Sequence, residues 1–133
     1  MLLFRVAGVL ILLSAASAVG QTGRIGSCLS YEPAVVRLGG ILKHETVPGP
    51  PNYEDVRKGD RPETYWFVEL SRPICVGEDK AEPDVNPAKN KITRVQLVLD
   101  PEAYTAYAGL MGRRVMATGT LFAAITGHHH TPV

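Results

Sequence analysis

The sequence has little of what most enzymes and nucleic-acid binders carry. It contains two cysteines, one tryptophan and 7% aromatic residues, and its 14 Lys and Arg residues are nearly matched by 13 Asp and Glu residues. A near-neutral charge argues against a nucleic-acid partner, because binding to the phosphate backbone needs an excess of basic side chains. The same balance argues against electrostatic docking on an anionic membrane.

Catalytic motifs are also missing. The sequence has no P-loop, no dinucleotide-binding glycine motif, no H-E-x-x-H and no G-x-S-x-G. Its 133 residues give room for one domain and not for an enzyme with a separate cofactor domain. These absences favour a protein that is not an enzyme, and no cofactor is expected apart from a zinc or copper ion considered below.

The N-terminus carries the longest apolar run, Val6 to Leu13, between Arg5 and a run of small residues. This is the pattern of a secretory signal peptide over residues 1–18, with cleavage expected after Ala18 and a second candidate site after Gly20. The run is shorter than the roughly 20 residues of a membrane-spanning helix. No stable membrane anchor is therefore expected, and a retained N-terminal anchor is the alternative. Export to the periplasm or the medium follows.

Removal of residues 1–18 leaves a chain with 13 basic and 13 acidic side chains and both cysteines. An exported chain with two cysteines is expected to form one disulfide, Cys28–Cys75. Two free thiols are the alternative.

Alternating hydrophobic residues and turn signals predict a mainly β domain over residues 31–133, after an extended segment 19–30. Polar, proline-rich loops are expected at 45–63 and 77–90, and Gly39-Gly40 predicts a bulge or a sharp bend. Asp100-Pro101 is typical of a helix start. Strands are expected at 34–43, 64–70, 92–99, 113–123 and 128–133, with a short helix at 101–108. This order is that of a small five-stranded OB-like Greek-key barrel with one short helix between strands three and four. A β-sandwich or roll is the alternative.

Several short sequence strings indicate a relation to a protein family. They are Cys28, Tyr31–Pro33, Gly49–Glu54, Gly59-Asp60, Pro73–Val76, Gln96-Leu97 and, most specific, the TGHHHTPV string at 126–133. Together they resemble the bacterial domain of unknown function 4431 over about residues 28–133. The resemblance implies a secreted or periplasmic, OB-like domain and brings no activity with it. The family pattern continues past TPV with a few apolar residues, so a short last strand is expected here.

The histidine string is the most unusual feature. On an extended strand His128 and His130 point to one face and His129 to the other. Two imidazoles do not complete a zinc or copper site, which takes about four ligands. Candidates to complete it are His44, Glu45, Asp60 and Glu63, all in or near the long loop. The alternatives are a structural role for these imidazoles, a pH-dependent contact, or proton-transfer catalysis.

The long loop and its neighbouring aromatics supply the other candidate binding residues. Its acids are interleaved with basic residues, which favours internal pairing over a cation site. A long ordered loop on a small barrel is still a natural binding surface. On the following strand Trp66, Val68 and Leu70 are expected inward, with Tyr65 and Phe67 forming an outward aromatic pair. The expected binding residues in this region are Asn52, Tyr53, Glu54, Asp60, Tyr65 and Phe67.

These observations favour an exported, non-catalytic binding module. Its ligand would be a protein, a peptide or a glycan, bound by the loop 49–63 and the histidine segment. The alternatives are a periplasmic zinc- or copper-binding protein, an inhibitor or immunity-type protein, and a metal-dependent hydrolase that uses the same histidines.

Overall fold

A computed structural model describes residues 2–4 and 27–133 of the chain. Both expected cleavage sites, the apolar run and residues 19–26 lie outside the described residues. The described part is mainly β, with one short α-helix, as the sequence predicts. Within residues 2–4 and 27–133, none of the helices has the length and hydropathy needed to cross a membrane.

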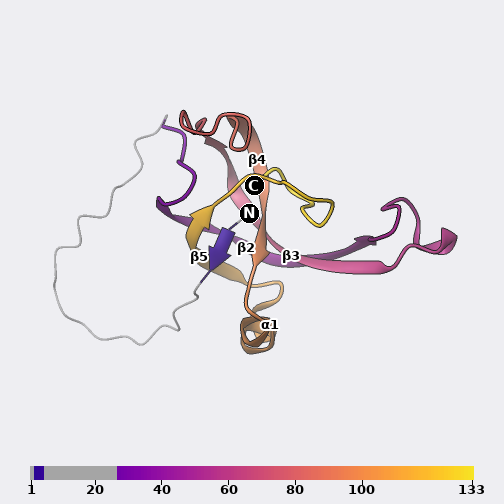
Figure 1. The fold of residues 1–133 in the computed structure, drawn as a ribbon. Helices are drawn as coiled ribbons and strands as arrows, with labels where there is room; N and C mark the ends of the chain where they lie inside the picture. Colours follow the sequence, from indigo (N-terminus) through magenta and orange to yellow (C-terminus); the bar gives the residue numbers. More distant parts are fainter. Residues whose placement is uncertain (1, 5–26) are drawn as a thin grey trace.

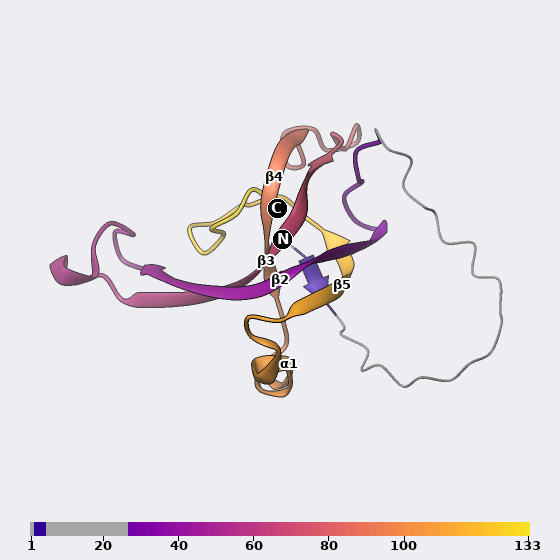
Figure 2. The same ribbon diagram turned by 180° about the vertical axis from the view of Figure 1, so that it is seen from behind.

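Four long strands form one antiparallel sheet, as Figures 1 and 2 show from opposite sides. They are β2 (Val35–Pro48), β3 (Pro62–Val76), β4 (Lys89–Val98) and β5 (Arg114–Leu121). β3 pairs with β2 and β4, and β2 also pairs with β5, which gives the order β4-β3-β2-β5. The strands carry the alternating apolar residues expected of a sheet with one core-facing side.

The N-terminal segment bridges the two edges of this sheet. Strand β1 (Leu2–Phe4) runs parallel to β4 on one side and antiparallel to β5 on the other, so the ring of strands closes only through it. The prediction of a fifth strand at residues 128–133 is wrong, because this segment forms turns and irregular backbone. Residues 31–133 by themselves thus give four strands and not a closed barrel.

The bend expected at Gly39-Gly40 is where β2 changes partner. Its first half pairs with β5 up to Ile41, and its second half pairs with β3 from Gly40 onward. A Cβ atom at Gly40 would lie 2.2 Å from the carbonyl oxygen of Glu69, so only glycine allows this close approach. One long strand can therefore serve both the sheet and a projecting hairpin.

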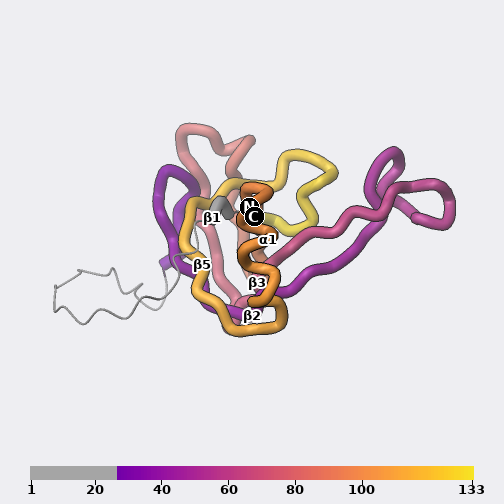
Figure 3. Tube along the Cα trace, turned by 90° about the horizontal axis from the view of Figure 1, so that it is seen from below, coloured from indigo at the N-terminus to yellow at the C-terminus, as the bar shows by residue number. Residues whose placement is uncertain are grey.

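β2 and β3 extend beyond the body of the sheet as a hairpin whose far end stands clear of the other strands in all three views (Figures 1, 2 and 3). Both strands are longer than predicted. Residues 45–48 of β2 pair with residues 62–65 of β3, so the two strands continue as far as Pro48 and Pro62. The Thr46 and Thr64 hydroxyls are hydrogen-bonded at 2.7 Å across this extension. The loop proper is 49–61, with a 3-10 turn at Val56–Lys58.

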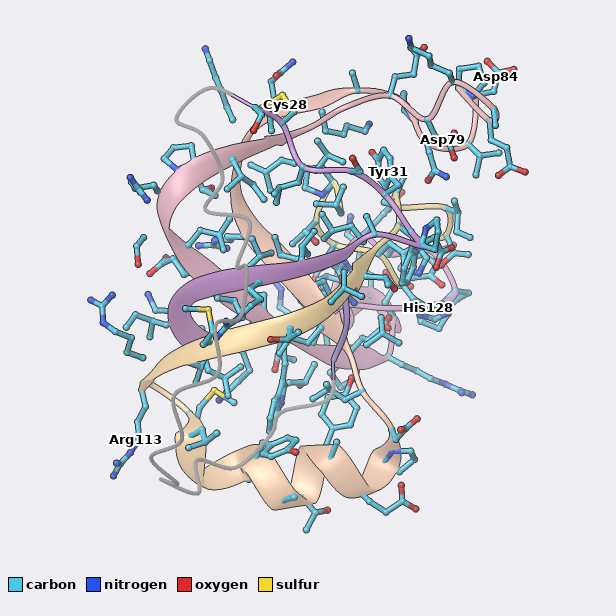
Figure 4. The ribbon with its side chains drawn as sticks, turned by 90° about the vertical axis from the view of Figure 1, so that its left-hand side faces the viewer. Cys28, Tyr31, Asp79, Asp84, Arg113 and His128 are labelled. Atoms are coloured by element: carbon cyan, nitrogen blue, oxygen red, sulfur yellow. A yellow bond between two sulfur atoms is a disulfide. The ribbon has the colours of Figure 1, made fainter. Side chains whose placement is uncertain are left out.

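The helix α1 (Pro101–Tyr107) lies between β4 and β5 in the chain and continues into a 3-10 turn at Ala108–Leu110. Pro101 opens it as expected, while Asp100 makes no side-chain cap hydrogen bond. Tyr104 packs edge-on against Trp66, with ring centroids 5.1 Å apart. Figure 4 shows Arg113 close to α1 at one end of the molecule and Cys28 at the other.

The core lies between the curled strands. It is formed by buried residues of all four long strands together with Tyr31, Ala123 and Val133, while Trp66 and Leu70 pack against it from partly buried positions. Val68, Val95, Leu121 and Val133 are fully buried. The inward assignment of Val68 from its alternation with Phe67 is thus confirmed.

The disulfide Cys28–Cys75 is present and joins the segment before β2 to β3. Leu29 continues the contact, because its backbone pairs with Val76 and exchanges hydrogen bonds with Cys75 and Gly77, each at 2.8 Å. Tyr31 then enters the core and donates its hydroxyl to the carbonyl of Pro87.

Loss of the disulfide should destabilise the protein strongly. A closed loop of about 48 residues contributes about 4 kcal/mol in the chain-entropy model. Urea unfolding of the Cys28→Ala/Cys75→Ala variant should show a free energy lower by about that amount. Reductant should destabilise the wild type equally and leave the variant unchanged. Equal stability of the oxidised wild type and the variant would contradict the prediction.

Candidate functional site

The tip of the β2–β3 hairpin is organised by one carboxylate, that of Asp60. This side chain is 3% exposed. One oxygen accepts hydrogen bonds from the backbone and side-chain nitrogens of Asn52, and the other accepts from the backbone nitrogens of Glu54 and Asp55, at 2.8 to 3.2 Å. Four donors thus converge on Asp60 and fix the shape of the loop around it.

These hydrogen bonds favour the charged form of Asp60. The backbone N–H groups of Asp55, Glu54 and Asn52 hold the pKa of its carboxyl below the usual value. Asp55 is used in a similar way, because Arg57 donates to it from its side chain and its backbone and lowers its pKa. The structure therefore gives Asp60 a structural role, and its oxygens are engaged by the loop itself.

The histidine segment docks on this hairpin through Glu63. Nδ1 of His128 donates to the Glu63 carboxylate at 2.7 Å. In that tautomer Nε2 accepts from the Tyr53 hydroxyl at 3.4 Å, and the two rings meet edge-on. Gly127 makes space for the Tyr53 ring, because a Cβ atom at position 127 would lie 2.9 Å from that ring. The loop and the C-terminal segment, remote in sequence, thus form one continuous surface.

His130 lies deeper in the same contact. Its ring stacks on that of Tyr65, with centroids 4.6 Å apart. Its Nε2 lies 3.9 Å from Oε2 of Glu63, beyond hydrogen-bond distance, and both atoms are buried without a hydrogen-bond partner among the described residues. One carboxylate is thus flanked by two imidazoles, as the expected shared face of His128 and His130 suggests.

His129 serves the turn and not the surface. Its Nδ1 accepts hydrogen bonds from the backbone nitrogens of Ile125 and Thr126, at 2.7 and 3.1 Å, and its ring meets Phe122 edge-on. Burial lowers the pKa of His129, which favours the neutral form that this acceptor role requires. The expectation that His129 contacts a ligand therefore finds no geometric support.

A buried amide on β4, Gln96, holds the histidine segment against the sheet. Its Oε1 accepts from the backbone nitrogen of His130 at 2.7 Å, and its Nε2 donates to the carbonyl of His128 at 3.0 Å. Its backbone nitrogen donates to the Thr131 hydroxyl. The sequence predicts no role for Gln96, because the alternation places Val95 and Leu97 inward and Gln96 on the opposite face, where a polar residue is expected to be exposed.

The prediction that Tyr65 and Phe67 form an open aromatic surface is wrong. Tyr65 and Phe67 do lie on the side of β3 away from the main core, but they are 7% and 2% exposed. His130 covers Tyr65, and the guanidinium of Arg94 lies 4.8 Å from the centre of the Phe67 ring. Glu45 completes the cover by accepting from Tyr65 and Arg94.

The expected metal ligands are brought together only in part, because Glu63 lies beside His128 and His130 but His44 does not join them. His44 is exposed and lies opposite Trp66 in the β2–β3 register, whereas Tyr65 points to the other face of the hairpin, towards His130. Within residues 2–4 and 27–133, no group of three or more His, Cys, Asp or Glu side chains could hold a metal ion. The zinc or copper alternative therefore lacks a ligand set in this part of the chain.

What the site does present is an exposed, well-ordered tip. Tyr53 and Val56 are 38% and 43% exposed, the side chain of Arg57 is 90% exposed, and that of His128 is 57% exposed. Tyrosine and arginine are the side chains that most often dominate binding energy at protein interfaces. Figure 4 places His128 on the side of the molecule away from Cys28 and Arg113.

Replacing Asp60 with asparagine should destabilise the loop in a pH-dependent way. The lowered pKa of Asp60 means that its stabilising contribution is full above the unfolded-state value and is lost as the pH falls through the folded-state value. Asp60→Asn should therefore lower the melting temperature at pH 7, with the difference shrinking towards pH 2. Thermal unfolding across this range tests it, with exposed Glu54→Gln as the control. A difference that does not change with pH would contradict the assignment.

Replacing Gln96 with methionine should release the histidine segment. The variant keeps the volume of the side chain but leaves the His130 N–H and the His128 carbonyl without their partner, which costs roughly 2 kcal/mol. Hydrogen exchange at residues 126–131 should accelerate, while exchange in the hairpin tip stays slow. Unchanged exchange in this segment would show that Gln96 does not hold it.

Comparison with known proteins gives one match. The family model of the domain of unknown function 4431 matches residues 94–133, which comprise the second half of β4, α1, β5 and the histidine segment. No curated protein and no solved structure matches the chain. The strings at 28–33, 49–60 and 73–76 lie outside the matched residues. Over residues 94–133, which include Gln96 and TGHHHTPV, the resemblance of the chain to this family is confirmed.

Proposed function

We propose that this protein is an exported, non-catalytic binding module that contacts a protein partner through the tip of the β2–β3 hairpin and the adjoining His128. The observation that carries the proposal is the ordered projecting tip. Asp60 fixes its backbone, Glu63 joins it to the histidine segment, and Tyr53 and Arg57 remain exposed. A preorganised surface binds with less loss of conformational entropy than a flexible loop.

A protein is the ligand class that this shape favours among the protein, peptide and glycan ligands that the sequence allows. Glycans and other small ligands bind mostly in concave sites that bury most of their surface. The tip instead stands out from the sheet (Figures 1 and 2). The aromatic pair that could stack on a sugar ring, Tyr65 and Phe67, is covered.

The projection also supports a second candidate, an inhibitor or immunity-type protein. A stiff hairpin can enter the cleft of a partner, and the exposed Tyr53, Val56 and Arg57 would then meet the walls of that cleft. This candidate differs from a general binding module only in the effect on the partner. It predicts that binding through the tip lowers the activity of the bound protein.

Export and an OB-like fold form part of the proposal. A disulfide is typical of proteins that fold in oxidising compartments, and the expected signal peptide has the same implication. The chain order of β2, β3, β4, α1 and β5, with β2 paired to both β3 and β5, agrees with the strand order of an OB-fold.

Site-specific photocrosslinking tests the proposed surface. A photoreactive phenylalanine analogue at position 53, in the full chain expressed in its own cells, should give one protein adduct of defined mass. The matched control is position 85, where Val85 is 50% exposed in a different loop. Arg57→Ala should reduce the yield about tenfold, as for an interface residue of large effect, and Glu63→Gln should reduce it by loosening the docked segment.

The result that overturns the proposal is the same set of adducts at positions 53 and 85, or no adduct at either. Binding of the purified protein to a glycan array with the same dependence on Tyr53 would place the ligand in another class. An enzymatic assay of the captured partner, with and without the protein, then separates the inhibitor from the general binding module.

A further inference from the structure

The two edges of the four-stranded sheet, β4 and β5, face each other across a gap of one strand. Neither edge pairs directly with the other, and in the described structure β1 lies between them. Leu2 and Leu3 are in register with Leu97 and Val98 of β4. On the other side, residues 2–4 are in register with Leu121, Thr120 and Gly119 of β5. The gap therefore accepts an extended backbone on both sides.

We propose that this gap is a strand-acceptor site, which takes an extended apolar segment of another protein once residues 1–18 have been removed. The proposal goes beyond the hairpin surface, since it concerns a different part of the molecule. It uses the cleavage that the sequence predicts after Ala18, because that cleavage removes the strand that occupies the gap in the full chain.

Vacating the gap leaves backbone groups of two neighbouring edges without partners. Buried or half-buried N–H and C=O groups that lack hydrogen bonds are costly, and exposed strand edges pair readily with other chains. Leu97 is 5% exposed and Leu121 is fully buried, so part of this gap opens onto the core. An incoming strand would pair with both edges at once, which is the usual basis of strand addition to a sheet.

The ends of the gap fix which segment fits. The C-terminal segment occupies the neighbouring part of the β4 edge, where Gln96 donates its backbone N–H to Thr131 and more distantly to Val133. The C-terminus accordingly lies near β1 in Figures 1 and 2. The stretch that an incoming strand can pair with is therefore short. It comprises residues 97–98 of β4 on one side and residues 119–121 of β5 on the other.

The register sets the chemistry of the occupant. A residue that enters the rung of Leu97 and Leu121 meets two core side chains and must be apolar. The next rung pairs the incoming strand with Val98 and Thr120, both partly buried, and the one after that pairs it with Gly119. In the full chain residues 2–4 pair along these rungs, and their direction, parallel to β4, is the direction expected of the partner strand.

Hydrogen exchange on the exported protein tests the proposal. The full chain is expressed with its own N-terminus, the product is purified from the periplasm, and its intact mass establishes whether residues 1–18 are absent. A synthetic peptide with the sequence of Met1 to Ala7 is then the probe. We expect it to slow amide exchange at residues 97–98 and 119–121 at least about tenfold, with no change in the hairpin tip.

Two matched peptides control for nonspecific apolar binding. The Leu3→Pro peptide lacks one backbone donor and should give no protection. The peptide of reversed sequence has the same composition but places the residues in the wrong order for a strand parallel to β4, and it should protect at least about tenfold less than the original peptide. Because only the peptides are changed, folding of the protein is not in question.

Three results would overturn the proposal. The first is a product that retains residues 1–18, in which case the gap keeps its own strand. The second is slow exchange at residues 97–98 and 119–121 before peptide is added, together with a dimeric mass, which would assign the gap to a second copy of the chain. The third is equal protection by the original peptide and the Leu3→Pro peptide.

Discussion

The buried amide of Gln96 makes hydrogen bonds with both its oxygen and its nitrogen to the backbone of the histidine segment. A segment of three histidines and a proline has no apolar alternation to place it in a sheet, and Pro132 has no N–H to give to a ladder. The Gln96 side chain supplies the backbone partners that a neighbouring strand would otherwise give. The positions of His128 and His130, and with them the docking on Glu63, depend on this clamp.

A second polar constraint acts at the other end of the site. Asp60 collects four hydrogen bonds within its own loop and so converts a proline-rich connection into a fixed shape. Glu63, on the strand that leaves the loop, then meets His128. Two carboxylates close in sequence thus have different roles. One is enclosed by backbone donors, and the other joins two segments that are 65 residues apart in the chain.

The two sides of the sheet beneath the site differ in how their strands are paired. β2 and β3 are long and pair over nine residues each, from Gly40 to Pro48 and from Pro62 to Leu70, and the disulfide joins Cys28 to β3. The edges of β4 and β5 depend on a strand of three residues from the N-terminus. In the proposals made above, the hairpin side is a preformed contact surface, and the β4–β5 side receives a strand.

The amino-acid sequence by itself determined the mainly β class, the helix at Pro101, the disulfide pair and the matching TGHHHTPV segment, because each rests on local patterning or on a count of two cysteines. It also identified the loop and the histidines as candidate binding residues. Only the tertiary structure decided how these side chains are used. Burial of Tyr65 and Phe67 under His130 and Arg94 and the clamp of Gln96 arise from residues distant in sequence. A periodic pattern gives the face of a strand on which a side chain lies, but what covers that face depends on where the rest of the chain packs.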